Sequence, residues 1–185
     1  MAVYYDKKKK TMFHKPQTTG EVKAIPMNLP MKIVSIAALV LLAGLIALSI
    51  YGYTQHNNGS FVLAEGWSMP SGVVFLFLPI VALIICLGFR LALRAIPLNM
   101  WRLPASIKNA AIKTEGKYLK FCTLLLEMET TIMFLFITYV LNLGAMPGDL
   151  PVLLWVLVIA ATIVIFGRYD IVEASKINNS EILKK

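Results

Sequence analysis

Four long apolar blocks dominate the sequence, at residues 33–53, 71–91, 118–143 and 150–166. A helix needs about 20 apolar residues to cross a hydrocarbon layer of about 30 Å. The four blocks meet this requirement. Strands are not expected, because they would leave backbone groups unpaired in lipid. We therefore predict an all-α integral membrane protein with four transmembrane helices.

The composition supports this interpretation. Hydrophobic residues make up 58% of the 185 residues, whereas ordinary soluble domains contain about 45–50% apolar residues. The surplus lies in the four blocks and is not spread along the chain, so it indicates membrane segments and not a larger soluble core.

The basic residues alternate along the chain. Seven Lys or Arg precede the first span, none lies in the first connection, seven lie from Arg90 to Lys120 across the second connection and the span ends beside it, none lies in the third connection, and four follow the last span. The positive-inside rule then predicts an antiparallel bundle with both termini in the cytoplasm or an equivalent interior compartment. This divides the chain into a basic N-terminal segment (1–32), a transmembrane domain (33–166) and a cytoplasmic tail (167–185).

The net charge of +8 indicates the kind of partner to expect. The basic residues flank the apolar spans, so we expect contact with anionic lipid at the inner face and no nucleic acid. Each lysine near anionic lipid contributes about 1 kcal/mol to binding. A cluster at the N-terminus is a candidate surface for lipid or for a partner protein, and it comprises Lys7, Lys8, Lys9 and Lys10.

Two glutamates within the third span are the strongest anomaly in the sequence. Glu127 lies about 10 Å along the helix from Lys120, at 1.5 Å per residue. A charged side chain at the centre of a membrane helix costs about 2.5–3.5 kcal/mol on insertion scales. Glu127 and Glu129 differ by about 200° around the helix, so they point to nearly opposite faces. The face of Glu127 also carries four of the candidate site residues, namely Thr123, Thr130, Thr131 and Thr138.

Three interpretations of the two acids remain open. In the first, both acids are structural: they are protonated or snorkel towards the membrane boundary, and they hydrogen-bond to threonines, since no cationic residue is expected deep enough in a span to pair with them. In the second, Glu127 and the threonines form a path for a proton, a cation or a substrate. In the third, an acid makes a polar contact with another subunit.

The sequence contains no set of residues typical of a cofactor site or an enzyme. There is no nucleotide-binding glycine motif, and neither His14 nor His56 lies in a span, so we predict no haem, metal or other cofactor. Cys86 and Cys122 fall in apolar blocks and are expected to be free, buried thiols. The pair Cys122 and His14 is only a weak catalytic candidate.

Short motifs around the second and third spans suggest a family. Residues 65–68 read EGWS and lead into FLFLPI at 75–80. The following connection carries IPLN at 96–99, LP at 103–104 and an asparagine at 109, and the next helix starts with YLKF at 118–121. Over about residues 53–167 the chain resembles small bacterial membrane proteins built around a domain of unknown function. Where that family has an I-P-x-H-F loop, this chain reads QHNN at 55–58. The resemblance assigns no activity and no catalytic residue.

These observations favour a non-enzymatic membrane protein. We predict an accessory, assembly or regulatory subunit that acts through helix contacts and its basic inner surface, with other membrane subunits or a second copy as partners. The alternative is a transporter or channel component that uses Glu127 and the threonine stripe. A membrane enzyme is a third, less favoured class.

Overall fold

The computed structural model describes residues 27–56, 58–64, 67–96 and 98–183. The N-terminal lysine cluster and His14 lie outside the described residues. Within the described part the regular elements are helices, apart from one short hairpin. In chain order the elements are α1 (Leu29–His56), β1 (Ser60–Ala64), β2 (Trp67–Pro70), α2 (Ser71–Ala95), the 3-10 turn η1 (Leu98–Met100), α3 (Ala105–Lys113), α4 (Lys117–Asn142) and α5 (Asp149–Ile182).

Four of these helices, α1, α2, α4 and α5, are long and apolar enough to cross a membrane. The predicted all-α class and the four spans are therefore confirmed at the level of helix length and composition. The helix α5 has 34 residues and continues beyond Phe166, where the apolar block ends. At 1.5 Å per residue it is about 51 Å long. Hydropathy marks only the apolar part of such a helix, because charged residues such as Arg168 and Glu173 continue it without a break.

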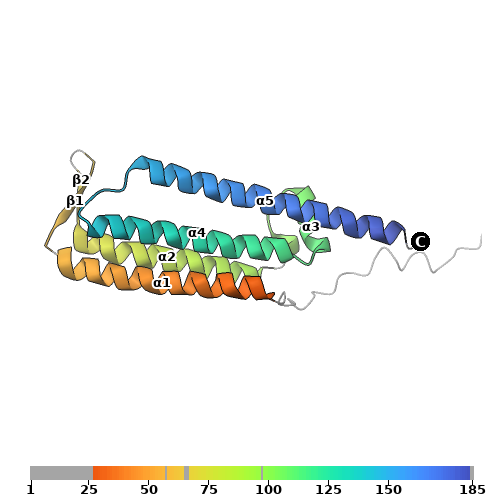
Figure 1. The fold of residues 1–185 in the computed structure, drawn as a ribbon, viewed down its shortest axis with the longest axis horizontal. Helices are drawn as coiled ribbons and strands as arrows, with labels where there is room; N and C mark the ends of the chain where they lie inside the picture. Colours follow the sequence, from red (N-terminus) through yellow and green to blue (C-terminus); the bar gives the residue numbers. More distant parts are fainter. Residues whose placement is uncertain (1–26, 57, 65–66, 97, 184–185) are drawn as a thin grey trace, which may run out of the picture.

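Helices α1, α2 and α4 form a three-helix core, and α5 lies along the outer side of α4 (Figure 1). The buried residues of α1 recur at intervals of three, four or seven, which is the spacing of a left-handed helix seam. They are Met31, Ser35, Ala38, Leu45, Ser49 and Gly52. Most of them are small, and small residues allow helices to approach closely where apolar burial gives little net driving force.

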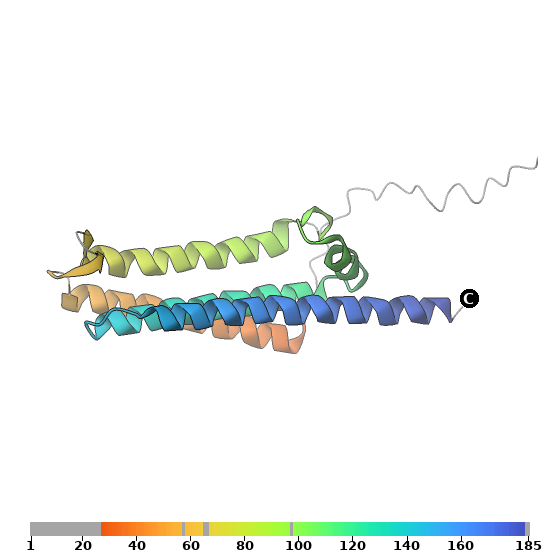
Figure 2. The same ribbon diagram turned by 90° about the horizontal axis from the view of Figure 1, so that it is seen from above.

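The connections fall at two opposite ends of the bundle. The hairpin β1–β2 and the link between α4 and α5 lie at one end, and the start of α1, the helix α3 and the end of α5 lie at the other (Figure 1). The connections that lack Lys and Arg therefore share one end, and the basic second connection lies at the opposite end. Seen from above, the last part of α5 projects beyond the other helices (Figure 2).

The hairpin is joined to the two helices that flank it. Strands β1 and β2 pair antiparallel, with Ser60 opposite Pro70. At the first residue of α2, the buried Ser71 hydroxyl contacts the backbone carbonyls of His56 and Gly59. The end of α1 and the start of α2 are thereby held together at this end of the bundle.

Candidate functional site

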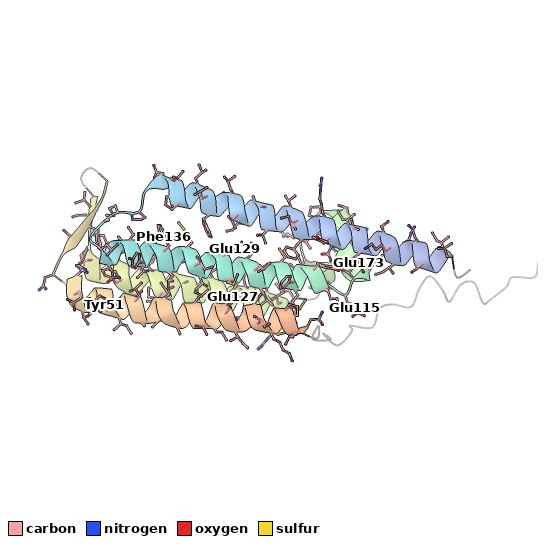
Figure 3. The ribbon with its side chains drawn as sticks, viewed as in Figure 1. Tyr51, Glu115, Glu127, Glu129, Phe136 and Glu173 are labelled. Carbon is pink, nitrogen blue, oxygen red and sulfur yellow. The ribbon has the colours of Figure 1, made fainter. Side chains whose placement is uncertain are left out.

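The candidate site is built on α4, whose two glutamates point to different neighbours. Figure 3 shows Glu127 on the side of α4 that faces α1 and α2, and Glu129 on the side that faces α5. This divergence agrees with the expected separation of about 200° for residues two positions apart in a helix. The two acids therefore belong to two different contacts.

Glu127 forms an ion pair at the centre of the three-helix core. Its Oε1 accepts a hydrogen bond from Nε of Arg90 on α2, with an N–O distance of 2.8 Å. The Arg90 Nη2 also donates to the backbone carbonyl of Ser35 on α1, at 3.3 Å. The Glu127 side chain is 1% exposed and that of Arg90 is 25% exposed. One guanidinium thus connects all three core helices.

The prediction that no cationic residue pairs with either acid was wrong. The backbone of Arg90 lies near the end of α2, where the sequence places it, but its long side chain reaches the acid on α4. A second contact fits the same antiparallel register, because Cys86 Sγ lies 3.4 Å from Thr131 Oγ1. Residues 86 and 90 are one turn apart on α2, and residues 127 and 131 are one turn apart on α4. Two polar pairs at this matched spacing are the signal that could have located the ion pair in the sequence.

The threonines of the predicted stripe are buried on the same face as Glu127. Three of their hydroxyls donate to carbonyls one turn earlier in α4: Thr123 to Leu119 at 2.9 Å, Thr131 to Glu127 at 2.8 Å and Thr138 to Phe134 at 2.8 Å. These hydroxyls are satisfied by their own helix, a common arrangement for threonine in apolar helices. The carboxylate of Glu127 is therefore held by Arg90. Thr123, Thr131 and Thr138 were expected to hydrogen-bond to this carboxylate, but they bond to backbone carbonyls instead.

Glu129 has a different partner, on α5. Its Oε1 accepts a hydrogen bond from Thr162 Oγ1 at 2.7 Å. Its second oxygen, Oε2, is buried and has no hydrogen-bond partner among the residues that the structure describes. Nε1 of Trp155, which lies two turns before Thr162 on α5, is also buried and has no hydrogen-bond partner among the described residues. Both residues line a groove of about 380 Å³ between α4 and α5.

A further buried carboxyl was not singled out from the sequence. Asp170 on α5 is 1% exposed and accepts a hydrogen bond from Thr114 Oγ1 at 2.9 Å. Thr114 ends α3, and the next two residues, Glu115 and Gly116, adopt left-handed backbone angles that turn the chain into α4. This hydrogen bond joins the connection between α3 and α4 to α5. Local sequence patterns do not indicate this contact, because Asp170 lies past the last apolar block.

The two thiols are free and buried, as predicted for Cys86 and Cys122. Cys86 contacts Thr131, and the proposed partner of Cys122, His14, lies outside the described residues. Within the described ranges, no three His, Cys, Asp or Glu side chains are grouped so that they could hold a metal ion.

The structure has four helices that are long and apolar enough to cross a membrane, and this arrangement fits a multi-pass membrane protein. Comparisons of the chain with protein-family models, with curated proteins and with solved structures find no match.

Proposed function

We propose that this chain is a non-enzymatic, multi-pass membrane subunit that assists the assembly or regulation of a larger membrane complex. In this proposal α1, α2 and α4 form a scaffold fastened by Arg90 and Glu127, and α5 presents a surface to a neighbouring subunit. The helix bundle has its basic end, with α3 and the end of α5, on the cytoplasmic or equivalent interior side.

The shape and exposure of α5 are the observation that carries the proposal. The helix has 34 residues, and among those whose burial the structure describes, the buried ones are Thr162, Asp170 and Ala174. Leu157 and Val164 are more than half exposed. The polar end of the helix also extends beyond the three-helix core (Figure 2). A helix attached along one side, with a polar extension, is suited to contact another protein both in the membrane and at its inner face.

Photo-crosslinking in intact cell membranes tests whether α5 contacts another subunit. A photoreactive residue placed at Leu157 on α5 is compared with one placed at Val40, an equally apolar position on α1 that is 65% exposed. We expect a crosslinked protein of one defined mass from position 157, recovered in a fixed ratio with this chain, and only lipid adducts from position 40. Lipid adducts alone from both positions would contradict the proposal.

Cysteine labelling tests the orientation. Ser60 in the hairpin and Ser180 near the end of α5 are both exposed, and the native thiols are buried, so background labelling should be low. After Ser60→Cys or Ser180→Cys, a membrane-impermeant maleimide should label position 60 from outside and position 180 only after the membrane is opened. Labelling of both positions from one side would exclude the proposed topology.

One observation favours a second candidate function, a proton or cation path through the core. The Oε2 atom of Glu127 is buried and has no partner among the described residues. If Glu127 carries a proton or a cation, Glu127→Gln should abolish an ion flux in proteoliposomes while the protein stays folded. If the wild-type protein supports no flux above that of empty liposomes, the subunit proposal is favoured.

A further inference from the structure

We propose that a cavity between α3, the start of α4 and α5 binds the headgroup of a phospholipid that carries a primary amine. Two lysines hold its phosphate and two carboxylates hold its ammonium group. The cavity lies at the basic end of the bundle, away from the ion pair of Glu127 (Figure 3). This site rests on the insertion of the four long helices in a membrane and not on the subunit role.

The cavity has a charged lining that a ligand can reach. Its volume is about 310 Å³, at the lower end of the range of roughly 300–1,000 Å³ for ligand pockets. Lys113, Glu115 and Lys117 line it from the end of α3 and the turn into α4, and all three are exposed. Glu173 lines it from α5, and its side chain is 41% exposed. Charged groups from two sides therefore surround a space that suits one small polar group.

Two ring contacts between α4 and α5 indicate the height of the cavity in the membrane. Phe121 packs against Phe166 with ring centroids 5.3 Å apart, and one turn nearer the basic end Tyr118 stacks on Tyr169 at 6.1 Å. Tyrosine is enriched where the hydrocarbon layer meets the polar interface. Glu173 lies four residues beyond Tyr169, about 6 Å at 1.5 Å per residue, and the polar region on each side of a bilayer is roughly 5–8 Å thick. The charged lining is therefore at the level of phospholipid headgroups.

The charges on the lining define the chemistry of the headgroup. The ammonium groups of Lys113 and Lys117 balance the carboxylates of Glu115 and Glu173, so these four side chains have no net charge. A free phosphate would meet both carboxylates, and a metal cation would meet both ammonium groups. A zwitterion instead places one charge of each sign beside partners of the opposite sign. A headgroup with a phosphate and an amine supplies this pair of charges.

The contacts that these side chains already make leave donors and acceptors for a ligand. Lys113 Nζ donates to Asn178 Oδ1 at 3.2 Å, and an ammonium group has three donors. Glu173 Oε2 pairs with Lys176 at 3.5 Å in an exposed contact, and such surface pairs contribute little to stability. A primary ammonium group donates hydrogen bonds to carboxylates, whereas a trimethylammonium group has no N–H to donate. The cavity should therefore prefer an ethanolamine headgroup over a choline headgroup.

Native mass spectrometry of the purified full chain tests this preference. The protein in detergent micelles receives equal amounts of phosphatidylethanolamine and phosphatidylcholine with the same acyl chains, and the adducts of each lipid are compared. We expect about fivefold more adducts of the ethanolamine lipid, which is about 1 kcal/mol at 1.4 kcal/mol per factor of ten and matches a partly exposed ion pair. Equal adducts of the two lipids would overturn the proposal. This result is independent of crosslinking from Leu157, so the lipid site and the subunit role can fail separately.

Two variants with matched controls assign the effect to the cavity. Glu173→Gln should remove the preference for ethanolamine, whereas Asp149→Asn, which neutralises an exposed acid in the first turn of α5 at the opposite end of the bundle, should keep it. Lys117→Gln should lower the adducts of both lipids, whereas Arg102→Gln, at an exposed basic position outside the cavity lining, should not. Equal losses in the Lys117 and Arg102 variants would indicate attraction by the overall basic charge and would overturn the site.

A soluble competitor distinguishes a lipid from a small molecule with the same headgroup. Glycerophosphoethanolamine has the phosphate and the amine but no acyl chains. In large excess it should leave the lipid adducts unchanged, because the acyl chains hold the lipid headgroup at the level of the cavity. Displacement of the lipid by this compound would show that the cavity takes a soluble ligand, and the assignment to a phospholipid would be wrong.

Discussion

Glu127 and Glu129 are the same residue type on one helix, two positions apart, yet they lie in different environments. Glu127 is fully buried among three helices and pairs with a cation. Glu129 faces a single peripheral helix and takes one hydrogen bond from a neutral hydroxyl, and its other oxygen is buried without a partner among the described residues. Both acids lie in the same apolar helix, so the hydropathy of α4 does not distinguish them. Their difference shows that the register of the neighbouring helices decides what a carboxyl in an apolar helix does.

The same contrast separates the three-helix core from α5. Small residues on α1 bring it close to its neighbours, and the ion pair joins all three helices. The helix α5 is attached to α3 and α4 by hydrogen bonds between neutral or singly charged partners and by ring contacts. The hydrogen bonds join Thr162 to Glu129, Thr114 to Asp170 and Lys113 to Asn178, and the ring contacts join Tyr118 to Tyr169 and Phe121 to Phe166. We therefore expect substitutions in the core to cost more stability than substitutions at the α4–α5 contact.

The largest effect is expected from Arg90→Leu. It leaves the buried Glu127 carboxyl without its cation, and breaking a buried ion pair in this way costs about 3–5 kcal/mol. Unfolding in mixed detergent micelles, followed by circular dichroism, measures the loss. The matched control is Arg94→Leu, one turn later at an exposed position, which should cost well under half as much.

The double variant with Arg90→Leu and Glu127→Leu sharpens this result. Removing both charges should restore much of the stability, since a buried pair can often be replaced by apolar residues. A double variant that is as unstable as the sum of the two single variants would show that the side chains do not interact across the core.

An intermediate effect is expected from Gly52→Ala on α1. An added Cβ would overlap the ring of Phe75, which is fully buried between α1 and α2, so the ring would have to shift. Overpacking of this kind costs about 1–3 kcal/mol.

Gly88→Ala is the matched control for Gly52, because nothing lies within 4 Å of its added Cβ. It should be neutral or stabilising by up to about 1 kcal/mol, since alanine favours helix more than glycine. Equal changes in the unfolding midpoint for the two alanine variants would contradict the close approach of α1 to α2.

The smallest effect is expected from Thr162→Val. It removes the hydrogen bond to Glu129, and such bonds between membrane helices contribute about 0.6 kcal/mol on average. The control is Thr138→Val, which removes a bond within α4 only. Hydrogen exchange of α5 amides should increase in the Thr162 variant and not in the Thr138 variant. A loss as large as that of Arg90→Leu would reverse the proposed ranking of the two regions.

Much of the fold followed from local features of the sequence. The number and order of the long apolar helices depend on the length of each apolar block, and α1, α2, α4 and α5 match the four predicted spans. The opposite faces of Glu127 and Glu129 follow from helix geometry alone. The helical continuation of α5 past Phe166 was not anticipated, because hydropathy does not report where a polar helix ends.

By itself, the sequence determined that four apolar helices form, that the connections lacking Lys and Arg alternate with basic ones, and that α4 carries an acid on each of two faces. Those properties depend on residue type and on spacing within one segment. Only the tertiary structure decided that Arg90 reaches Glu127, that Thr162 meets Glu129 and that Thr114 holds Asp170. Each of these contacts joins residues more than 30 positions apart, and it depends on the axial offset between two packed helices. That offset is set by the packing of the whole bundle and not by either helix alone.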